Sequence, residues 1–360
     1  MASDNKNILL TGATGFIGGS VLAALLRSPS LQSGPVTCLM RGPDRASLLS
    51  ATYGHRVKPV LYEGLDDLEA TTAVAAQHDV VINTTLSYHS PSTKALLRGL
   101  AQRKAVTGHD VWMIHTSGTS NIADLVIANA DGRQLDDIAD DVYTFEKEKE
   151  SLGPYPQRTV ELDVIDTGLE LGVKTIVLMC PIIYGNGTGL FHNTSMHLVF
   201  MKAMIKLGRA VVVDDGAGVW DHVHVEDLAE LYRLLVQEIL EREGKALPTG
   251  KKGIVFNGNG QHSWLEFMKL VANAGYEEGA LLSNTVAHIS LEEAAKTLVP
   301  LIGFSDSMGD LTMLAAQILN SNARTVASVA RKLGWVPLKG EEVWESSVRD
   351  DIKTIVKSSI

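Results

Sequence analysis

The chain has few of the features that mark secreted or membrane proteins. It contains only two cysteines among 360 residues, and both lie in strand-like apolar runs. We therefore expect Cys38 and Cys180 to be buried free thiols of a cytoplasmic protein rather than a disulfide. No apolar run is long enough to cross a bilayer, and residues 1–7 are polar. We expect no membrane association and no secretory signal.

The sequence also lacks a surplus of positive charge. It has 32 Lys and Arg against 42 Asp and Glu, a net charge of −10. Such a chain has no basic excess to displace counterions, so we expect no nucleic-acid partner. No Cys/His cluster has the spacing of metal ligands, and we expect no metal. With 45% hydrophobic residues, the length suits one large domain or two smaller ones.

The most informative stretch that is present lies near the N-terminus. An apolar run at 8–10 ends at Thr11-Gly12, and apolar residues recur at helical spacing from Phe16. Gly12 permits a tight turn, Gly15 lets a pyrophosphate approach the backbone, and Gly18 allows the helix to pack closely on the strand. We predict a strand, a glycine turn and a helix that bind a dinucleotide through Gly12, Thr14, Gly15, Phe16, Ile17 and Gly18.

Further strands are predicted at 35–40, 57–61, 79–83, 111–114, 175–179 and 254–257, with helices between them. This alternation predicts an α/β fold with a doubly wound parallel sheet and a smaller, discontinuous substrate-binding lobe. We assign residues 1–181 and 216–259 to the dinucleotide-binding domain, and 182–215 and 260–360 to the lobe. The buried run at 79–83 delivers Thr84 and Thr85 to the carboxyl end of the sheet, where ligands bind.

The glycines follow the pattern Gly-x-x-Gly-x-x-Gly, and matching motifs occur at 115–119, 181–185, 222–229 and 333–337. Together they resemble the extended short-chain dehydrogenase/reductase superfamily, and the epimerase/dehydratase-like proteins of fungi in particular. The resemblance covers nearly the whole chain. It implies a nicotinamide cofactor flanked by Pro181 and Ile183. It also implies a contact between Asp66 and the adenine amine of that cofactor. The alternative role for this acid is to cap the following helix.

Cofactor preference is predicted from the end of the strand at 35–40. NAD sites place an acid there to bind the ribose hydroxyls, but this chain has Arg41, with Arg45 nearby. A guanidinium suits a 2′-phosphate, so we predict NADP(H) over NAD(H). The alternative is a solvated surface arginine.

The resemblance also implies catalysis by a Ser or Thr, a Tyr, and a Lys four residues after the Tyr. Ser117 matches the first position, with Thr119 as the substitute. Tyr143 and Lys147 have the expected spacing but lie in the charged segment 136–150, which we expect to be solvated. Tyr155 lies at the expected place, before a helix at 157–171, but a threonine occupies position 159. The third possibility is that neither tyrosine is catalytic.

For a small-molecule substrate, the predicted contacts are Thr119, Tyr184, His192, Asn193 and Trp220. We expect helices in 277–322 to cover the pocket, and an amphipathic helix at 324–333. The leading hypothesis is an NADP-dependent reductase or dehydrogenase acting on a carbonyl or hydroxyl of a small organic substrate, with secondary metabolism as one setting. The alternatives are a non-redox isomerase, lyase or cyclase, and a cofactor-sensing regulator without turnover. We expect a monomer or homodimer.

Overall fold

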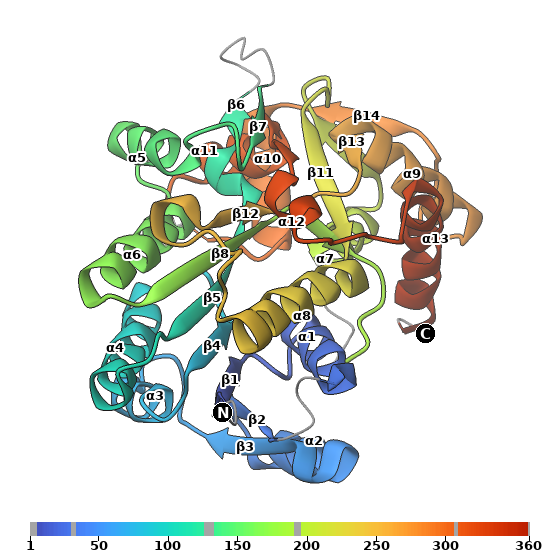
Figure 1. The fold of residues 1–360 in the computed structure, drawn as a ribbon. Coiled ribbons are helices and arrows are strands. Elements are labelled where there is room, and N and C mark those ends of the chain that lie inside the picture. Colours follow the sequence, from blue (N-terminus) through green and yellow to red (C-terminus); the bar gives the residue numbers. More distant parts are fainter. Residues whose placement is uncertain (1–5, 30–33, 126–132, 191–195, 306–308, 359–360) are drawn as a thin grey trace.

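The computed structural model describes residues 6–29, 34–125, 133–190, 196–305 and 309–358. Its centre is a seven-stranded parallel sheet (Figure 1). The spatial order of its strands is β12 (Ile254–Phe256), β8 (Lys174–Cys180), β5 (Trp112–Gly118), β4 (Val80–Asn83), β1 (Ile8–Thr11), β2 (Val36–Met40) and β3 (Val57–Leu61). All its strands except the edge strand β3 are mostly buried, as a sheet covered on both faces requires.

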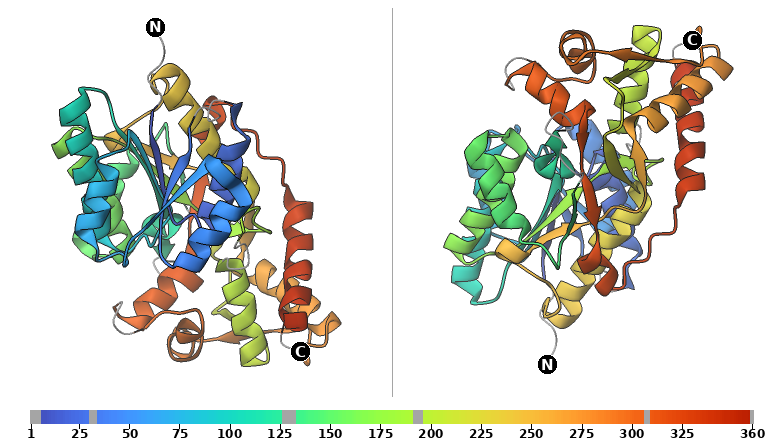
Figure 2. Two further views of the ribbon diagram at one scale, coloured as in Figure 1. Left: turned by 90° about the horizontal axis from the view of Figure 1, so that it is seen from below. Right: turned by 90° about the horizontal axis from the view of Figure 1, so that it is seen from above.

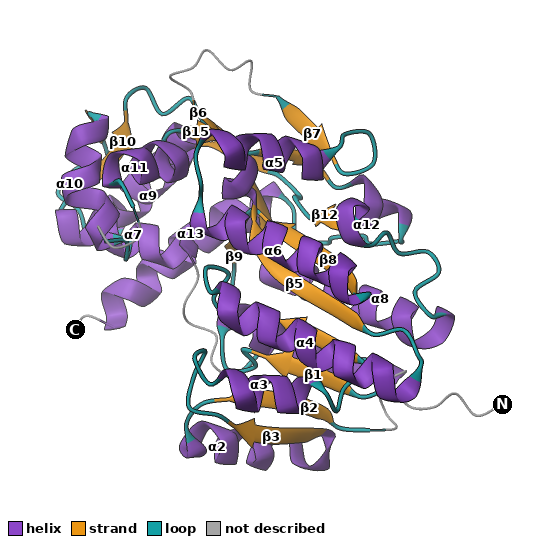
Figure 3. Ribbon diagram, turned by 90° about the vertical axis from the view of Figure 1, so that its left-hand side faces the viewer, coloured by secondary structure: helices purple, strands orange, loops and turns teal. Residues whose placement is uncertain are grey.

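Helices cover both faces of this sheet, which confirms the doubly wound fold. Figure 3 shows three helices side by side over one face: α3 (Leu68–Ala75), α4 (Ser90–Thr107) and α6 (Pro156–Leu171). On the other face, α1 (Phe16–Arg27) packs against α8 (Val225–Arg242). A further helix, α2 (Pro43–Tyr53), packs beside β3.

A second group of elements lies beyond the carboxyl ends of the strands (Figure 2). Its strands are β9 (Ile182–Tyr184), β10 (Ala210–Val213), β11 (Val219–His224), β13 (Gln261–Ser263) and β14 (Val286–Ile289). Its helices are α7 (Met196–Leu207), α9 (Trp264–Glu277), α10 (Leu291–Leu301), α11 (Leu311–Leu319) and α13 (Glu341–Ser358). β11 lies between β9 and β13, and β10 pairs with β14.

The apolar side chains form two main clusters that correspond to the sheet and to this second group. The C-terminal part contributes to both, because Ala327, Ala330 and Trp335 pack with the sheet while Trp344 packs with the second group. The exact domain boundaries stay a prediction. Cys38 and Cys180 are buried free thiols, as expected. Within the described residues, no helix combines the length and apolarity needed to span a membrane.

Two predictions of local structure were wrong. The charged segment 136–150 is not simply solvated, because it contains most of α5 (Val142–Leu152), which packs on α6 and buries Val142, Tyr143 and Glu146. Residues 324–333 are not one helix. They form β16 (Arg324–Val326), paired with β7 (Gln134–Asp136), and then the short α12 (Ser328–Lys332). Pairing with a distant strand overrides the local helical periodicity there.

Candidate active site

The glycine turn between β1 and α1 is closely packed. Gly12 has φ +78°, a backbone conformation that favours glycine. A Cβ atom on Gly18 would lie 2.2 Å from the Gly12 carbonyl oxygen and 2.4 Å from the Thr84 hydroxyl oxygen. Gly15 is exposed, and it begins α1 without a side-chain cap. The first backbone N–H groups of α1 are therefore left for an anion.

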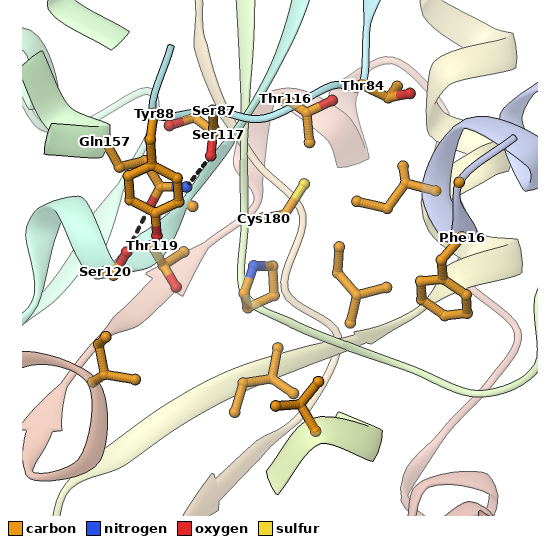
Figure 4. A pocket seen from close by; sticks show the side chains of 18 of the residues that line it. Phe16, Thr84, Ser87, Tyr88, Thr116, Ser117, Thr119, Ser120, Gln157 and Cys180 are labelled. Carbon is orange, nitrogen blue, oxygen red and sulfur yellow. Dashed lines mark hydrogen bonds between the residues drawn. The ribbon is translucent and has the colours of Figure 1, made fainter. Parts of the chain in front are cut away.

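A cavity of about 430 Å³ opens at the carboxyl ends of the central strands. Figure 4 shows Phe16 of α1 on one side, Ser87, Ser120 and Gln157 on the other, and Cys180 between them. The cavity is lined by Gly15, Phe16, Ile17, Thr84, Thr85, Ser87, Tyr88, Thr116, Ser117, Gly118, Thr119, Ser120, Tyr155, Gln157, Cys180, Pro181, Ile182, Ile183, Val199, Phe200, Trp220, Phe304 and Ile318. None of these lining residues carries a charge.

Many of the predicted cofactor residues meet at this cavity, and some lie away from it. Gly12, Thr14 and Gly18 belong to the turn beside it but do not line it. Arg41 is exposed after β2. Asp66 is exposed and contacts His89, 3.1 Å from Asp66 Oδ1 to His89 Nε2, whereas its neighbour Asp67 caps α3.

Tyr155 lies at the start of α6 and lines the cavity with only 4% of its surface exposed. Its hydroxyl donates to Ser120 Oγ at 3.2 Å, and Ser120 donates to Gln157 Oε1 at 2.7 Å. Gln157 Nε2 in turn donates to Ser87 Oγ at 2.7 Å. Burial raises the pKa of Tyr155, while hydrogen bonding with Ser120 and Tyr88 and the charge of nearby Arg158 partly oppose the shift. At neutral pH this phenol is a proton donor.

The structure does not bring Tyr143 and Lys147 to the cavity. The Tyr143 hydroxyl donates to Asp166 Oδ1 at 2.5 Å, and Lys147 Nζ lies 3.3 Å from Asp166 Oδ2. Burial and the adjacent Asp166 raise the pKa of Tyr143 to about 12. Their Tyr-x-x-x-Lys spacing therefore serves the contact of α5 with α6.

No lysine or arginine among the residues that line the cavity replaces the lysine that the resemblance places four residues after Tyr155, although the guanidinium of Arg158 lies 5.9 Å from the centroid of the Tyr155 ring. Thr159 hydrogen-bonds to Glu150 and to the Tyr155 carbonyl oxygen. The neighbouring Arg158 is buried, with Nε 2.8 Å from Glu150 Oε2 and Nη1 3.0 Å from the Asn121 carbonyl oxygen. Both side chains thus hold α6 against the preceding segment and do not line the cavity.

Behind Ser117 lies a group that sequence reasoning missed. Asn121 Nδ2 donates to Ser117 Oγ at 3.1 Å and to Glu161 Oε2 at 2.5 Å. Glu161 of α6 and Glu146 of α5 are both completely buried. Burial raises the pKa of both carboxyl groups, that of Glu161 to about 7, and the mutual repulsion of the carboxylates adds to the shift of Glu146. Their positions on helices in a polar-rich stretch gave no signal of this contact.

Some of the predicted substrate residues line the cavity, and others do not. Thr119 and Trp220 line the cavity. Tyr184 is fully buried outside it, with its ring edge-on to Trp344 at 5.0 Å between centroids. His192 and Asn193 lie outside the described residues. Ser87, Tyr88, Ser120 and Gln157 were not predicted, although Ser120 belongs to the same hydroxyl-rich stretch as Ser117 and Thr119.

The site fits a dinucleotide on its own geometry. The exposed Gly15 would bring its backbone beside a pyrophosphate, and only the Gly12 carbonyl oxygen lies within 4 Å of a Cβ built there. The hydroxyl groups of β4 and β5 end at the same cavity, so a ring held there would meet Ser117 and Tyr155. Among the described residues, no cluster of His, Cys, Asp and Glu is arranged to hold a metal.

Comparisons with known proteins agree with this geometry. "Oxidase ucsJ" of Acremonium sp is 31% identical over 345 residues, which cover 92% of this chain and 93% of that protein. The dTDP-glucose 4,6-dehydratase DesIV of Streptomyces venezuelae, solved with NAD and TYD, has a TM-score of 0.64 at 15% identity, covering 98% of this chain and 97% of that one. UDP-glucose 4-epimerase of Thermotoga maritima has a TM-score of 0.58 at 16% identity, covering 98% and 100%.

Residues 8–247 of the chain match the model of a protein family described as "NAD dependent epimerase/dehydratase family". This range contains the glycine turn, Ser117 and Tyr155. The chain therefore belongs to the NAD-dependent epimerase/dehydratase family and is an NAD(P)-dependent enzyme of the extended short-chain dehydrogenase/reductase type.

Proposed function

We propose that the protein is an NADP-dependent reductase or dehydrogenase that interconverts a carbonyl and a hydroxyl group on a small, uncharged organic substrate. The observation that carries this proposal is the cavity, in which Ser117, Thr119 and Tyr155 face a space without charged side chains, beside the glycine turn. The relative named as an oxidase adds support for redox chemistry.

Carbonyl reduction needs a hydride for the carbon and a proton for the oxygen. The bound nicotinamide would supply the hydride. The Tyr155 hydroxyl is protonated at neutral pH and can donate its proton to the nascent alkoxide. The resulting phenolate would accept one hydrogen bond from Ser120, whose hydroxyl would turn away from Gln157, and regain a proton from water once the product has left the cavity. Ser117 would orient the substrate oxygen by a hydrogen bond.

The lining of the cavity defines the substrate class. Its far end is built from Val199, Phe200, Trp220, Phe304 and Ile318. Two solved relatives are named for dTDP-glucose and UDP-glucose, whose diphosphates are anionic. A buried diphosphate needs a cation or several donors, and the described lining offers no lysine or arginine. We therefore propose a neutral, largely apolar carbonyl compound.

Arg41 supports a preference for NADPH. It is exposed directly after β2, beside the positive-φ Gly42, and no acid occupies this strand end. A guanidinium at this place can form paired hydrogen bonds with a 2′-phosphate. Cytoplasmic location and a monomeric or homodimeric state stay predictions.

A non-redox isomerase, lyase or cyclase is the second candidate. Thr159 stands where a lysine would lower the pKa of Tyr155, and burial instead raises that pKa. The phenol then stays protonated at neutral pH and is not available as the base that alcohol oxidation needs, which disfavours oxidation more than carbonyl reduction.

The test is to mix the purified protein and NADPH with a panel of neutral ketones and aldehydes, together with nucleotide sugars, and to follow both the NADPH absorbance and the products. Loss of absorbance matched by alcohol product supports the proposal. Substrate conversion without net oxidation would favour the second candidate. Cofactor binding without any conversion would indicate a cofactor-sensing regulator.

A further inference from the structure

The Glu146 and Glu161 carboxyl groups meet where α5 packs on α6, and they lie directly behind the cavity wall. Both side chains have no exposed surface. Within the described chain, no donor meets hydrogen-bond geometry with either oxygen of Glu146 or with Glu161 Oε1. Glu161 Oε2 accepts from Asn121 Nδ2, the same amide nitrogen that donates to Ser117 Oγ. One amide therefore links the carboxyl pair to a hydroxyl that lines the cavity.

Two ionised carboxylates cannot share such a site without a large penalty. The charged and titratable groups around the pair are few. Arg158 on α6 favours the ionised form of both carboxyl groups, and Cys180 on β8 lies close enough to Glu161 for its own pKa to be raised by that carboxylate, after the larger effect of burial. A single proton shared by the two carboxyl groups joins one oxygen of each, which satisfies two of the three oxygens that have no donor, and leaves one negative charge that Arg158 stabilises.

We propose that Glu146 and Glu161 share one proton at neutral pH, and that this proton sets the direction of the hydrogen bond that Ser117 makes in the cavity. Glu161 is thus a positioning residue that acts through Asn121 and Ser117. A lysine at position 159 would lower the pKa of Tyr155. In this chain the carboxyl pair instead controls the hydrogen bond that Ser117 makes with the substrate. The inference rests on the proposed reductase activity and adds a group to it.

The hydrogen bonds that Ser117 can make explain how the pair acts. Ser117 Oγ accepts from Asn121, and its own hydroxyl lies close enough to Glu161 to lower the pKa of that carboxyl by hydrogen bonding, so its hydrogen can point toward Glu161 or into the cavity. When the pair holds its proton, that hydrogen can point into the cavity and donate to a carbonyl oxygen. When the pair is fully ionised, the hydrogen is attracted to the carboxylates, and Ser117 presents only lone pairs to the substrate. Carbonyl reduction therefore requires the protonated pair.

The first test needs no substrate. Infrared spectra of the intact protein, recorded from pH 5 to pH 9, report the C=O stretch of a protonated carboxyl group. We expect this band at pH 7 in the native protein, with a decrease as the pH rises, and a loss of the band only in the double variant Glu146→Gln/Glu161→Gln, because burial alone keeps Glu146 protonated when Glu161 is replaced. Glu148→Gln, an exposed site on the same helix α5, is the matched control and should keep the band. Absence of the band from the native protein at pH 7 would overturn the inference.

The second test is the pH profile of turnover. In the native enzyme, kcat for reduction should fall by about tenfold per pH unit above the pKa of the pair. Glu161→Gln mimics the neutral pair and can still accept from Asn121, so its kcat should stay level from pH 6 to pH 9. Glu146→Gln removes the repulsion between the two carboxylates. Glu161 should then lose its proton at a lower pH, and the fall in kcat should begin at that lower pH. Native-like pH dependence in Glu161→Gln would refute the role of the pair.

The two tests separate this inference from the proposed function. A panel that gives no turnover would contradict the reductase, while the infrared band still decides whether the proton is shared. If Glu161→Gln does not fold, the direction of the shift in Glu146→Gln decides the same question. NADPH affinity should be unchanged in both variants, since neither side chain lines the cavity.

Discussion

At the scale of single residues, two tyrosines with similar sequence surroundings have different chemical settings. The hydroxyl of Tyr155 reaches a chain of neutral donors and acceptors that ends in the cavity. The hydroxyl of Tyr143 is held by the carboxylate of Asp166, outside the lining of the cavity. A phenol whose hydrogen is already committed to a carboxylate cannot serve a substrate oxygen, so the geometry favours Tyr155.

Replacing Tyr155 by Phe should lower kcat for carbonyl reduction by about 10²-fold or more, since a positioned acid contributes on that scale. Tyr143→Phe and Lys147→Ala should keep kcat within about twofold, because they remove a contact between α5 and α6 rather than a proton donor. Steady-state kinetics with NADPH, together with thermal unfolding of each variant, checks this. Full activity in Tyr155→Phe would remove that residue from the mechanism.

Replacing Arg41 by Ala should weaken NADPH binding by about tenfold or more, the value of a charge-assisted hydrogen bond, and leave NADH binding unchanged. Titration of each reduced cofactor by its fluorescence measures both dissociation constants. Arg98→Ala, at another exposed arginine on α4, is the matched control. Equal losses for the two cofactors would show that Arg41 does not contact the 2′-phosphate.

At the scale of elements, the position of α1 depends on its glycines. Gly18 lets this helix approach both the turn at Gly12 and the Thr84 hydroxyl, which donates to the Thr11 carbonyl oxygen at 2.7 Å. This contact joins β1, α1 and the end of β4 around one point. The glycine turn and the cavity wall are therefore parts of one packed unit.

Gly18→Ala should destabilise the protein by about 1–3 kcal/mol, because its Cβ would overlap backbone that cannot move without displacing β1. It should also weaken cofactor binding. Gly153→Ala is the control, since a Cβ there meets no atom within 4 Å, and its effect should stay within about 0.5 kcal/mol. Urea unfolding and NADPH titration measure the two effects. Equal stability of the two variants would contradict the close packing.

At the scale of the whole molecule, buried histidines join α13 to the strands of the second group. His222 on β11 stacks on Trp344 of α13, with ring centroids 4.2 Å apart, and its Nδ1 lies 3.1 Å from Nδ1 of His262 on β13. His197 on α7 contacts Asp351 of α13 at 3.1 Å. This cluster reaches the cavity lining through Trp264, whose ring contacts His262 on one side and the lining residues Phe200 and Trp220 on the other.

Burial, with a smaller effect from His197, lowers the pKa of His222 from 6.5 to about 3. Between these values the unfolded chain binds a proton that the folded protein does not, so this residue makes unfolding easier as the pH falls from 6.5 toward 3. His222→Asn should therefore reduce the loss of unfolding free energy between pH 6.5 and pH 5 by about 2 kcal/mol. Urea unfolding at both pH values tests this, with the exposed His109→Asn as control. If the difference in unfolding free energy between the two pH values is the same in His222→Asn as in the native protein, then another group causes the acid sensitivity.

Sequence patterns were sufficient for the seven strands of the central sheet and the glycine turn, because those features depend on neighbours within a few residues, and the alternation of strands with helices was sufficient for the doubly wound class. The side of the sheet on which ligands bind also follows from strand direction alone. The same reasoning failed at 136–150 and 324–333, where the outcome depends on which distant element covers the segment. A charged stretch can bury one face on a helix that comes later in the chain, as α5 does on α6.

Which tyrosine lines the cavity, and what surrounds position 159, depend on the tertiary structure. Spacing favoured Tyr143 and position before the helix favoured Tyr155, because a motif does not say which way a helix faces. The contact between Glu146 and Glu161, and the amide that ties it to Ser117, arise where two helices and a strand end converge. Burial and shared protons exist only after these elements have packed, and for that reason no pattern along the chain could reveal them.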